Sequence, residues 1–405
     1  MSSRAAALAA SLSTGLTREA THDVQVVSGL EALRALEADW RRLAAATNGG
    51  NPFLAWEWTI TWAEVMMAGH LETAVVRDGG EVVAIAPFYR NRYSIGPGVK
   101  ATSLQLYGPR ELQTIFELRQ IPMRPGQEAG IVRQLLRGLA ETARWDWIEV
   151  GEYGPRVECW REVMDAIPEG VRLVVEDRYA VPILPLRTDW EAQRSALRRN
   201  VKERIRRGYN TLKREGIEFE LEVDSEPAHS GARLDEFHRL HERRALMTEH
   251  KEHGNSFRHP RLRAFLAKAV PRMVEAGVLR FAALRSRGEV VATRLVFESD
   301  ASLYLYYSGF EPDWWDRSVM TVLVTELVKS AIARGVKSVN FSPGLDQFKS
   351  GWTEPEFNAP ISTFMFGRTT AASRVRLDAF RRRKRASSAV ASGIHRIRLR
   401  LGRAR

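Results

Sequence analysis

Cysteine and long apolar runs are what this chain has least of. Its 405 residues include one cysteine, Cys159, which excludes an intrachain disulfide and a site built from paired cysteines, and which fits a reducing compartment. No apolar run approaches the roughly 20 residues that cross a bilayer. The remaining composition, 44% hydrophobic and 27% charged, is typical of a globular protein. The length predicts two or three domains.

Acidic residues are scarce at the C-terminal end. From Phe366 to Arg405 thirteen Lys or Arg residues stand against one acid, Asp378, and this excess equals the whole net charge of +12. Residues 1–365 are therefore formally neutral, and the basic character belongs to a tail, predicted as 367–405.

The tail allows three interpretations. Apolar residues interleaved with arginines, as at Ile394, Ile397 and Leu401, are typical of a basic helix that lies on an anionic membrane surface. The run Arg381–Arg385 would also attract nucleic acid, which we favour less. A disordered, solubilising tail is the third interpretation.

The N-terminal end is also simple in composition. Residues 1–16 hold one arginine and an alanine-rich centre, a faint signal-peptide pattern without a leucine-type core. We predict a disordered segment over 1–22.

The body divides into two halves of α/β character, predicted as domains 23–185 and 186–366. In the first, strands at 71–77 and 81–89 meet at Asp78-Gly79-Gly80, a tight hairpin signal. Helices are expected at about 130–143 and 157–166 around a strand at 147–150.

The second half opens with a strongly basic helix. Thr188 or Asp189 is expected to cap it, and it is expected to run to Arg214, with nine basic residues between Arg194 and Arg214 against one acid, Glu203. A solvated helix face is the usual meaning of such a pattern, and a surface that holds an anionic substrate is the alternative.

A strand, turn, helix and strand succeed one another between Leu303 and Trp352. A strand that leads into a helix start is a ready site for a phosphate-bearing cofactor, because free backbone N–H groups and the helix dipole favour an anion. The residues expected at that start are Arg317, Ser318, Val319, Met320 and Thr321. An ordinary structural unit without a ligand is the alternative.

Histidines cluster on the helix predicted over 231–247. His238 and His241 are three residues apart, which places them on one helix face. We predict that His238, His241 and Arg243 contact a substrate. A metal site would need further ligands, such as His250 and His253, and we predict none because 248–255 is typical of a solvated loop.

The order of these motifs resembles the acyl-CoA N-acyltransferase (GNAT) superfamily, and specifically its CelD/BcsL-type branch. Members of that branch carry two tandem GNAT-like domains and are similar to the Fem aminoacyltransferases. The resemblance covers roughly Val24 to Phe366. Its carriers are Asn51-Pro52-Phe53 with Trp56-Glu57-Trp58, Ala84 to Tyr89, Leu184-Pro185-Leu186 before Trp190-Glu191, Leu197 to Asn200, Phe237 to His241, Tyr307 to Phe310, and Phe348 to Trp352.

The resemblance implies a fold and a cofactor. It implies two domains, each a twisted, mostly antiparallel sheet flanked by helices, with acyl-CoA as co-substrate and the first domain a degenerate copy. The loop after the strand has Asp346, Phe348, Lys349 and Trp352 in the family's places, and we predict that Trp352 contacts the substrate. Leu345 stands where an acid is common, and Asn340 where an Asp usually opens the strand.

The helix start also departs from the family pattern. Ser318-Val319-Met320 replaces Ser-Pro-Gly, and a methionine lets a pyrophosphate approach the backbone less closely than a glycine.

Acyl transfer to an amine requires a base, an acyl carrier and stabilisation of the oxyanion. We predict Asp346 as the base, with a turn residue or an ion-pair partner of Lys349 as its structural alternative. Lys349 is expected to neutralise a substrate anion. Tyr306 and Tyr307 should alternate faces of one strand, so that one of them could protonate a leaving thiolate, or they could simply pack.

These patterns together predict a cytoplasmic N-acyltransferase that acylates an amine or amino sugar, in cell-envelope or exopolysaccharide biosynthesis according to the resemblance. The basic tail would allow peripheral association with the inner face of the membrane. A Fem-like aminoacyltransferase that uses aminoacyl-tRNA, and a binding or scaffold protein of the same fold, are the two alternatives.

Overall fold

The computed structural model describes residues 23–47, 50–67, 69–108, 115–142, 144–247, 254–299 and 301–383. The segment predicted over 1–22 and the tail beyond 383 lie outside these residues. Among the described residues, no helix is long and apolar enough to cross a membrane.

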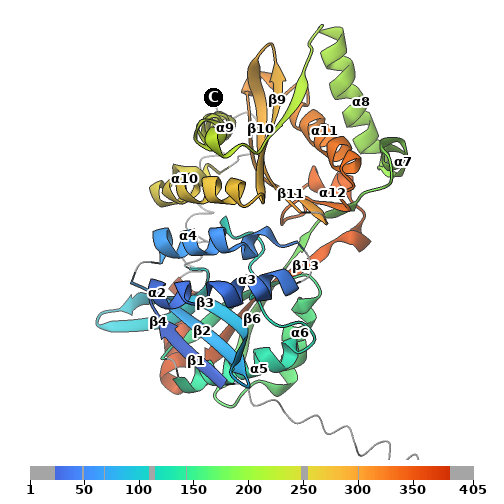
Figure 1. The fold of residues 1–405 in the computed structure, drawn as a ribbon. Coiled ribbons are helices and arrows are strands. Elements are labelled where there is room, and N and C mark those ends of the chain that lie inside the picture. The colour runs from blue at the N-terminus through green and yellow to red at the C-terminus, as the bar shows by residue number, and fades with distance from the viewer. Residues whose placement is uncertain are drawn as a thin grey trace, which may run out of the picture.

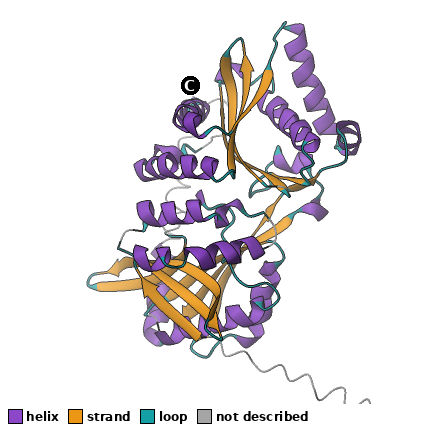
Figure 2. Ribbon diagram, viewed as in Figure 1, coloured by secondary structure: helices purple, strands orange, loops and turns teal. Residues whose placement is uncertain are grey.

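The first half contains one sheet with helices on both of its faces (Figures 1 and 2). Its elements are β1 (Asp23–Ser28), α2 (Leu30–Arg34), α3 (Glu37–Ala46), α4 (Trp56–Met66), β2 (Leu71–Asp78), β3 (Glu81–Gly96), β4 (Val99–Leu106), α5 (Glu128–Thr142), β5 (Trp147–Tyr153), α6 (Arg156–Glu162) and β6 (Val171–Val181). The predicted β2–β3 hairpin turns at Gly79 and Gly80, both with positive φ, as a two-residue hairpin loop requires.

The second half contains a separate sheet. Its elements are β7 (Ile183–Pro185), α7 (Trp190–Ala196), α8 (Arg199–Arg214), β8 (Glu220–Asp224), α9 (Ser230–Ala245), α10 (Pro260–Glu275), β9 (Leu279–Ser286), β10 (Glu289–Glu298), β11 (Ser302–Phe310), α11 (Val319–Ala333), β12 (Ser338–Asn340), α12 (Lys349–Trp352) and β13 (Ala359–Arg368). Helices α9 and α10 cover one face, and α8 and α11 cover the other (Figure 1).

The two sheets repeat one arrangement. Their strand orders are β1-β2-β3-β4-β5-β13-β6 and β7-β12-β11-β10-β9-β8. Each is antiparallel except for one central parallel pair, β4 with β5 and β11 with β12. A helix connects the strands of each pair, as a parallel crossover requires. The predicted mixed α/β fold with two mostly antiparallel sheets flanked by helices is confirmed.

Two strands lie in the sheet opposite to their predicted domain. β13 lies between β5 and β6 of the first sheet, and β7 pairs with β12 of the second. The predicted domain limits at 185 and 366 do not follow these strands, because neighbours in the sequence pair with different sheets. Each predicted domain therefore contributes one strand to the sheet of the other.

The first part of the predicted tail is folded onto the body. Residues 371–383 are helical. Leu377 is buried, Phe380 stacks on Trp147, and Arg376 pairs with Asp146 at 3.2 Å. Apolar residues between the basic ones therefore give this part of the predicted tail, 367–405, a face that packs on the first sheet.

One hydrophobic core runs through both halves. Trp58 of α4 makes edge contacts with Phe265 of α10, Phe297 of β10 and Tyr306 of β11, and these residues belong to one buried cluster. Helices α4 and α10 lie against each other between the two sheets (Figure 1). The halves are therefore joined by a core.

The predicted basic helix is two helices. Asp189 caps α7 by accepting a hydrogen bond from the Ala192 N–H at 2.8 Å, and the backbone is extended at Leu197 and Arg198 before α8 begins. Leu197 is buried. The break between α7 and α8 therefore places an apolar side chain in the core, which the pattern of charges did not predict.

Candidate active site between the two halves

The parallel strands β11 and β12 part shortly after they meet. Pairing covers Ser302–Tyr304 with Ser338–Asn340, while β11 continues to Phe310. From Tyr304 onward, this edge of β11 is therefore open to other parts of the chain.

Five charged side chains gather here, and we call them the polar centre. They are Glu117, Arg244, Arg294, Asp346 and Lys349, from the 115–124 loop, α9, β10, the loop after β12, and α12. The charges of Lys349 and Arg294 lower the pKa of Glu117. The charge of Asp346 raises the pKa of Arg244 and of Arg294. All five are half-buried, so solvent reaches a group of charges set on a buried core.

Glu117 enters the polar centre from the first half. Its carboxylate accepts a hydrogen bond of 2.6 Å from the hydroxyl of Tyr304 on β11. Burial raises the pKa of Glu117 to about 7, although this bond and the charges of Lys349 and Arg294 favour its ionised form. A carboxyl with a pKa near neutrality can take up and release a proton at physiological pH.

Two arginines converge on Ser308. Arg244 donates to its hydroxyl at 2.7 Å and Arg294 at 3.3 Å. Arg294 stands directly across from Ser308 in the β10–β11 ladder. Burial lowers the pKa of Arg294 to about 9 and that of Arg244 to about 10. The depressed pKa values reflect the cost of holding guanidinium charges out of water.

Asp346 is a turn residue in this structure. One carboxylate oxygen accepts the N–H groups of Phe348 and Lys349, each at 2.9 Å, which fixes the start of α12. The ammonium of Lys349 donates to the hydroxyl of Ser342 and the carbonyl of Pro343, each at 2.8 Å. Lys349 thus holds the loop in place through these hydrogen bonds. The negative charge of Asp346 favours the charged forms of Arg244 and Arg294.

The two predicted tyrosines do not alternate faces. Val296 pairs with Leu305 and Arg294 with Ser308, so Tyr306 and Tyr307 both stand opposite one residue in a β-bulge. Their rings lie 4.6 Å apart. The Tyr306 hydroxyl donates to the Ile115 carbonyl at 2.9 Å, which commits it to the contact between halves.

His238 and His241 are both buried on α9, on one face as predicted. The Nδ1 atom of His241 lies 2.9 Å from the Ser308 carbonyl, and burial lowers the pKa of both histidines, that of His238 to about 4. Phe257 packs on both rings. Among the described residues there is no group of three metal-binding side chains; His250 and His253 lie outside them.

The start of α11 is shaped differently from a simple anion site. Ser318 has left-handed backbone angles, and the N–H groups of Arg317, Ser318, Thr321 and Val322 donate to carbonyls of the same turn. Val319 and Thr321 are buried and Met320 is half-buried. Few of the expected backbone donors are left for a ligand.

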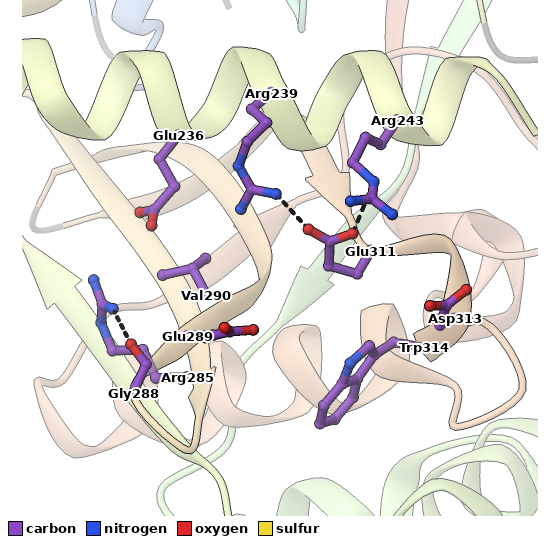
Figure 3. Close-up of a pocket in the computed structure, with 10 residues that line it drawn as sticks. All are labelled: Glu236, Arg239, Arg243, Arg285, Gly288, Glu289, Val290, Glu311, Asp313 and Trp314. Atoms are coloured by element: carbon purple, nitrogen blue, oxygen red, sulfur yellow. Dashed lines mark hydrogen bonds and ion pairs between the residues drawn. The ribbon is translucent and has the colours of Figure 1, made fainter.

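Two neighbouring cavities lie next to this helix start. One of about 510 Å³ has Arg239, Arg243 and Glu311 in its wall (Figure 3), and one of about 650 Å³ has Arg287 and Arg317. Trp314 and Glu289 line both.

The predicted substrate residue Arg243 lies at the first of these cavities. It pairs with Glu311 at 2.9 Å, and Arg239 pairs with the same carboxylate. Figure 3 shows both guanidinium groups directed at this carboxylate. Arg243 therefore lines a cavity and pairs with Glu311, while Arg244 donates to Ser308.

Trp352 lies in the core of the second half. It is 2% exposed and packs on Phe341 and Phe348. Packing in the core accounts for Trp352, and its indole has little exposed surface with which to contact a substrate.

Three residues of the site were missed from the sequence: Glu117, Arg244 and Arg294. A signal existed for two of them, because Arg294 is the one charge between Val290 and Phe297, and Arg244 comes after His241 at helical spacing. Glu117 gave none, since it lies in an irregular loop and its partner Tyr304 is 187 residues away.

Comparison with known proteins agrees with this geometry. Residues 199–350 match the model of the acetyltransferase (GNAT) domain. The second half of the chain is thus similar to a GNAT acetyltransferase domain over these residues.

Solved structures extend the likeness to both halves. FemX is 10% identical with a TM-score of 0.54, over 85% of this chain and 96% of that one. A conserved protein of unknown function from Bacteroides thetaiotaomicron is 13% identical (TM-score 0.48; 81% and 96% covered). A tandem GNAT protein from the clavulanic acid biosynthesis pathway is 11% identical (TM-score 0.44; 85% and 98% covered). No curated protein matches the sequence.

Proposed function

We propose that the protein is an N-acyltransferase of the CelD/BcsL type that moves an acyl group from acyl-CoA to an amine or amino sugar. The observation that carries this proposal is the polar centre at the parting of β11 and β12. It combines a carboxyl that can accept a proton with cations that can hold anionic groups, as amine acylation needs. A role in cell-envelope or exopolysaccharide biosynthesis rests on the resemblance alone.

Acyl-CoA would approach from the start of α11. The cavities there have aromatic surface from Trp314 and cationic groups from Arg287 and Arg317, which suits a nucleotide with phosphates. The Arg317 guanidinium donates to Glu215 at 2.7 Å, so binding a phosphate would require it to exchange this partner. We expect these side chains, more than the backbone of Ser318 to Thr321, to hold the donor.

Acyl-CoA titration tests this proposal directly. Thermal unfolding is measured with acetyl-CoA and longer acyl-CoAs, since a ligand of the folded state raises its stability by mass action. Release of free thiol is then monitored with a panel of amines. Stabilisation together with amine-dependent thiol release is expected, and absence of both with every donor would contradict the proposal.

A second candidate function rests on the exposed face of α8. Arg199, Arg206, Arg207, Lys213 and Arg214 are all exposed on this helix, and such a face attracts phosphates. An aminoacyl-tRNA donor would use it. Stabilisation by charged tRNA without stabilisation by any acyl-CoA would favour this candidate. No stabilisation by either ligand would favour a non-catalytic binding protein.

We propose a cytoplasmic location with loose association with anionic membrane through the basic tail. The residues that motivate this, beyond 383, lie outside the described structure. Co-sedimentation with anionic liposomes should fall after removal of residues 384–405, and unchanged co-sedimentation would end the proposal.

A further inference from the structure

Glu117 and Arg294 carry opposite charges at the polar centre without pairing. Each shifts the pKa of the other, so they are close, yet no ion pair joins them among the described residues. Glu117 bonds with Tyr304, and Arg294 makes one long hydrogen bond, 3.3 Å, with Ser308.

Arg294 has hydrogen-bonding capacity to spare. A guanidinium offers five N–H donors, and the Nε of Arg294 is buried without a partner. Nearby, Arg204 of α8 has two such nitrogens and lies over the Phe348 ring, while its pKa is lowered by burial and partly restored by the charge of Asp346. A buried arginine without an ion-pair partner is costly. Arg294 is only half-buried, and an anion bound at the accessible part of its side chain would offset that cost.

We propose that the acceptor substrate carries an anionic group, a carboxylate or a phosphate, beside its amine. Arg294 binds the anion, and Glu117, supplied by the first half, binds the ammonium and acts as the catalytic base. This inference rests on the proposed acyltransferase function and narrows its acceptor to amino acids, amino-sugar acids or amino-sugar phosphates.

The chemical step balances with these groups. The ammonium gives one proton to the Glu117 carboxylate, and the free amine attacks the thioester carbonyl. The C–N bond forms, the C–S bond breaks, and the second proton lost by nitrogen goes to the leaving thiolate. Glu117 then releases its proton to solvent, so the net products are an amide, a thiol and one proton.

Glu117 suits the role of base better than Asp346. One oxygen of Asp346 already accepts two backbone N–H groups, which hold the carboxylate in the turn. Glu117 faces Tyr304, Tyr306, Lys349 and Arg294, and its pKa of about 7 keeps a large fraction ionised and still basic at neutral pH.

The experiment compares acceptors with and without the anion. With acetyl-CoA as donor, kcat/KM is measured for glycine against glycinamide and for glucosamine 6-phosphate against glucosamine. We expect the wild-type protein to prefer one anionic acceptor over its neutral partner at least tenfold, and the pair that shows the preference identifies carboxylate or phosphate. Arg294→Gln should abolish the preference, since comparison between variants cancels the different amine basicities.

Glu117 is tested in the same assay. Glu117→Gln should lower kcat by roughly 10²- to 10⁴-fold, should raise KM for the amine because the carboxylate that binds the ammonium is lost, and should remove the rise in activity with pH around pH 7. Tyr304→Phe removes a hydrogen bond that lowers the pKa of Glu117, so this rise should move to higher pH. A pH profile unchanged in Tyr304→Phe would count against Glu117.

Matched controls are available in the same two sheets. Arg280→Gln on β9, whose guanidinium lies 3.7 Å from Glu298, and Glu176→Gln on β6, which pairs with Arg161 at 2.9 Å, should leave acceptor preference and pH profile unchanged. Thermal shift with the anionic acceptors gives a readout without turnover, and should be lost in Arg294→Gln and kept in both control variants.

The failure of each proposal is distinguishable. A wild-type protein that acylates anionic and neutral acceptors equally would overturn the anion site while leaving the acyltransferase function intact. If no acyl-CoA is used, the acyltransferase proposal fails. A thermal shift by glycine or glucosamine 6-phosphate that depends on Arg294 would then still support the anion site, and its absence would end that proposal too.

Discussion

The two halves of this protein share one sheet arrangement and differ in the path that the chain takes after the first strand of the parallel pair. In the second half, β11 runs along β10 to Phe310 and α11 begins nine residues later. In the first half, the chain leaves β4 at Tyr107, a buried residue with positive φ. Among the described residues that follow, Met123 returns to β3 and bridges to Ala84. The same fold thus leaves its strand edge open in one half and fills it in the other.

The returning loop explains why the halves are unequal. Its Leu118 carbonyl accepts a hydrogen bond from Asn51 at 2.9 Å, and its Gln120 carbonyl accepts one from the Tyr107 hydroxyl at 2.8 Å. The loop occupies the first half with its own backbone and presents Glu117 to Tyr304 of the second. The first half, in which a loop fills the opening beside the strand, can therefore still supply the Glu117 carboxylate to the site of the second half.

The sharpest test of this shared organisation is to damage the common core. Trp58→Ala should cost about 3–5 kcal/mol of the free energy of unfolding, because Trp58 is fully buried and contacts both halves. Urea unfolding monitored by circular dichroism should show one transition at lower urea. Leu246→Ala, at a side chain that is 72% exposed, is the control. Two separate transitions, with only one of them shifted, would show that the halves are independent.

The second test concerns the close approach of α9 to β11. In Gly309→Ala the new Cβ would lie 2.3 Å from the His241 nitrogen and 2.5 Å from the Leu240 carbonyl carbon, so α9 must move. We expect a cost of about 1–3 kcal/mol and reduced acyl transfer, because α9 carries Arg244. Gly231→Ala, on the same helix with open space around it, should be neutral or stabilising. Equal melting temperatures and activities for the two variants would contradict the close contact.

The third test separates two carboxylates of the first half by pH. Because the pKa of Glu117 is raised by burial to about 7, the folded state holds its proton more tightly than the unfolded state. Stability is therefore lost as pH rises from about 4.5 to 7, and Glu117→Gln should gain on the order of 1 kcal/mol relative to wild type above pH 7.

Glu176 gives the opposite sign. Burial acts against its ionisation, but bonds from Arg178 and Arg161 outweigh it and lower its pKa. Its contribution should be present above the unfolded pKa and lost as pH falls through the folded one. Parallel pH curves for Glu117→Gln and Glu176→Gln in chemical denaturation would refute the assignment of a proton to folded Glu117.

The smallest effect is expected at the polar bridge between α4 and α10. Arg272 donates to Thr61 at 2.7 Å and to Glu64 at 3.0 Å, but it is partly exposed. Arg272→Ala should cost below about 1 kcal/mol, and less at high salt. A loss comparable to that of Trp58→Ala would mean that charge, and not the core, joins the halves.

Much of the second half could be predicted from local patterns. The three strands before α11 and the turn at Gly335, which has positive φ, are indicated by apolar alternation and glycine placement. Asp346 and Lys349 were placed on the right loop, and both lie in the polar centre. The sequence did not indicate their roles. Whether a carboxylate caps a helix or faces a substrate depends on contacts with residues far away in the chain.

The sequence by itself determined the element order, the tandem repeat and the basic C-terminal segment, since each depends on residues close together in the chain. Only the tertiary structure decided which sheet β7 and β13 would join, that a bulge would place Tyr306 and Tyr307 together, and that Glu117 would meet Tyr304. These outcomes depend on pairing and burial between residues far apart in sequence, where the gain from a shared core outweighs local preference.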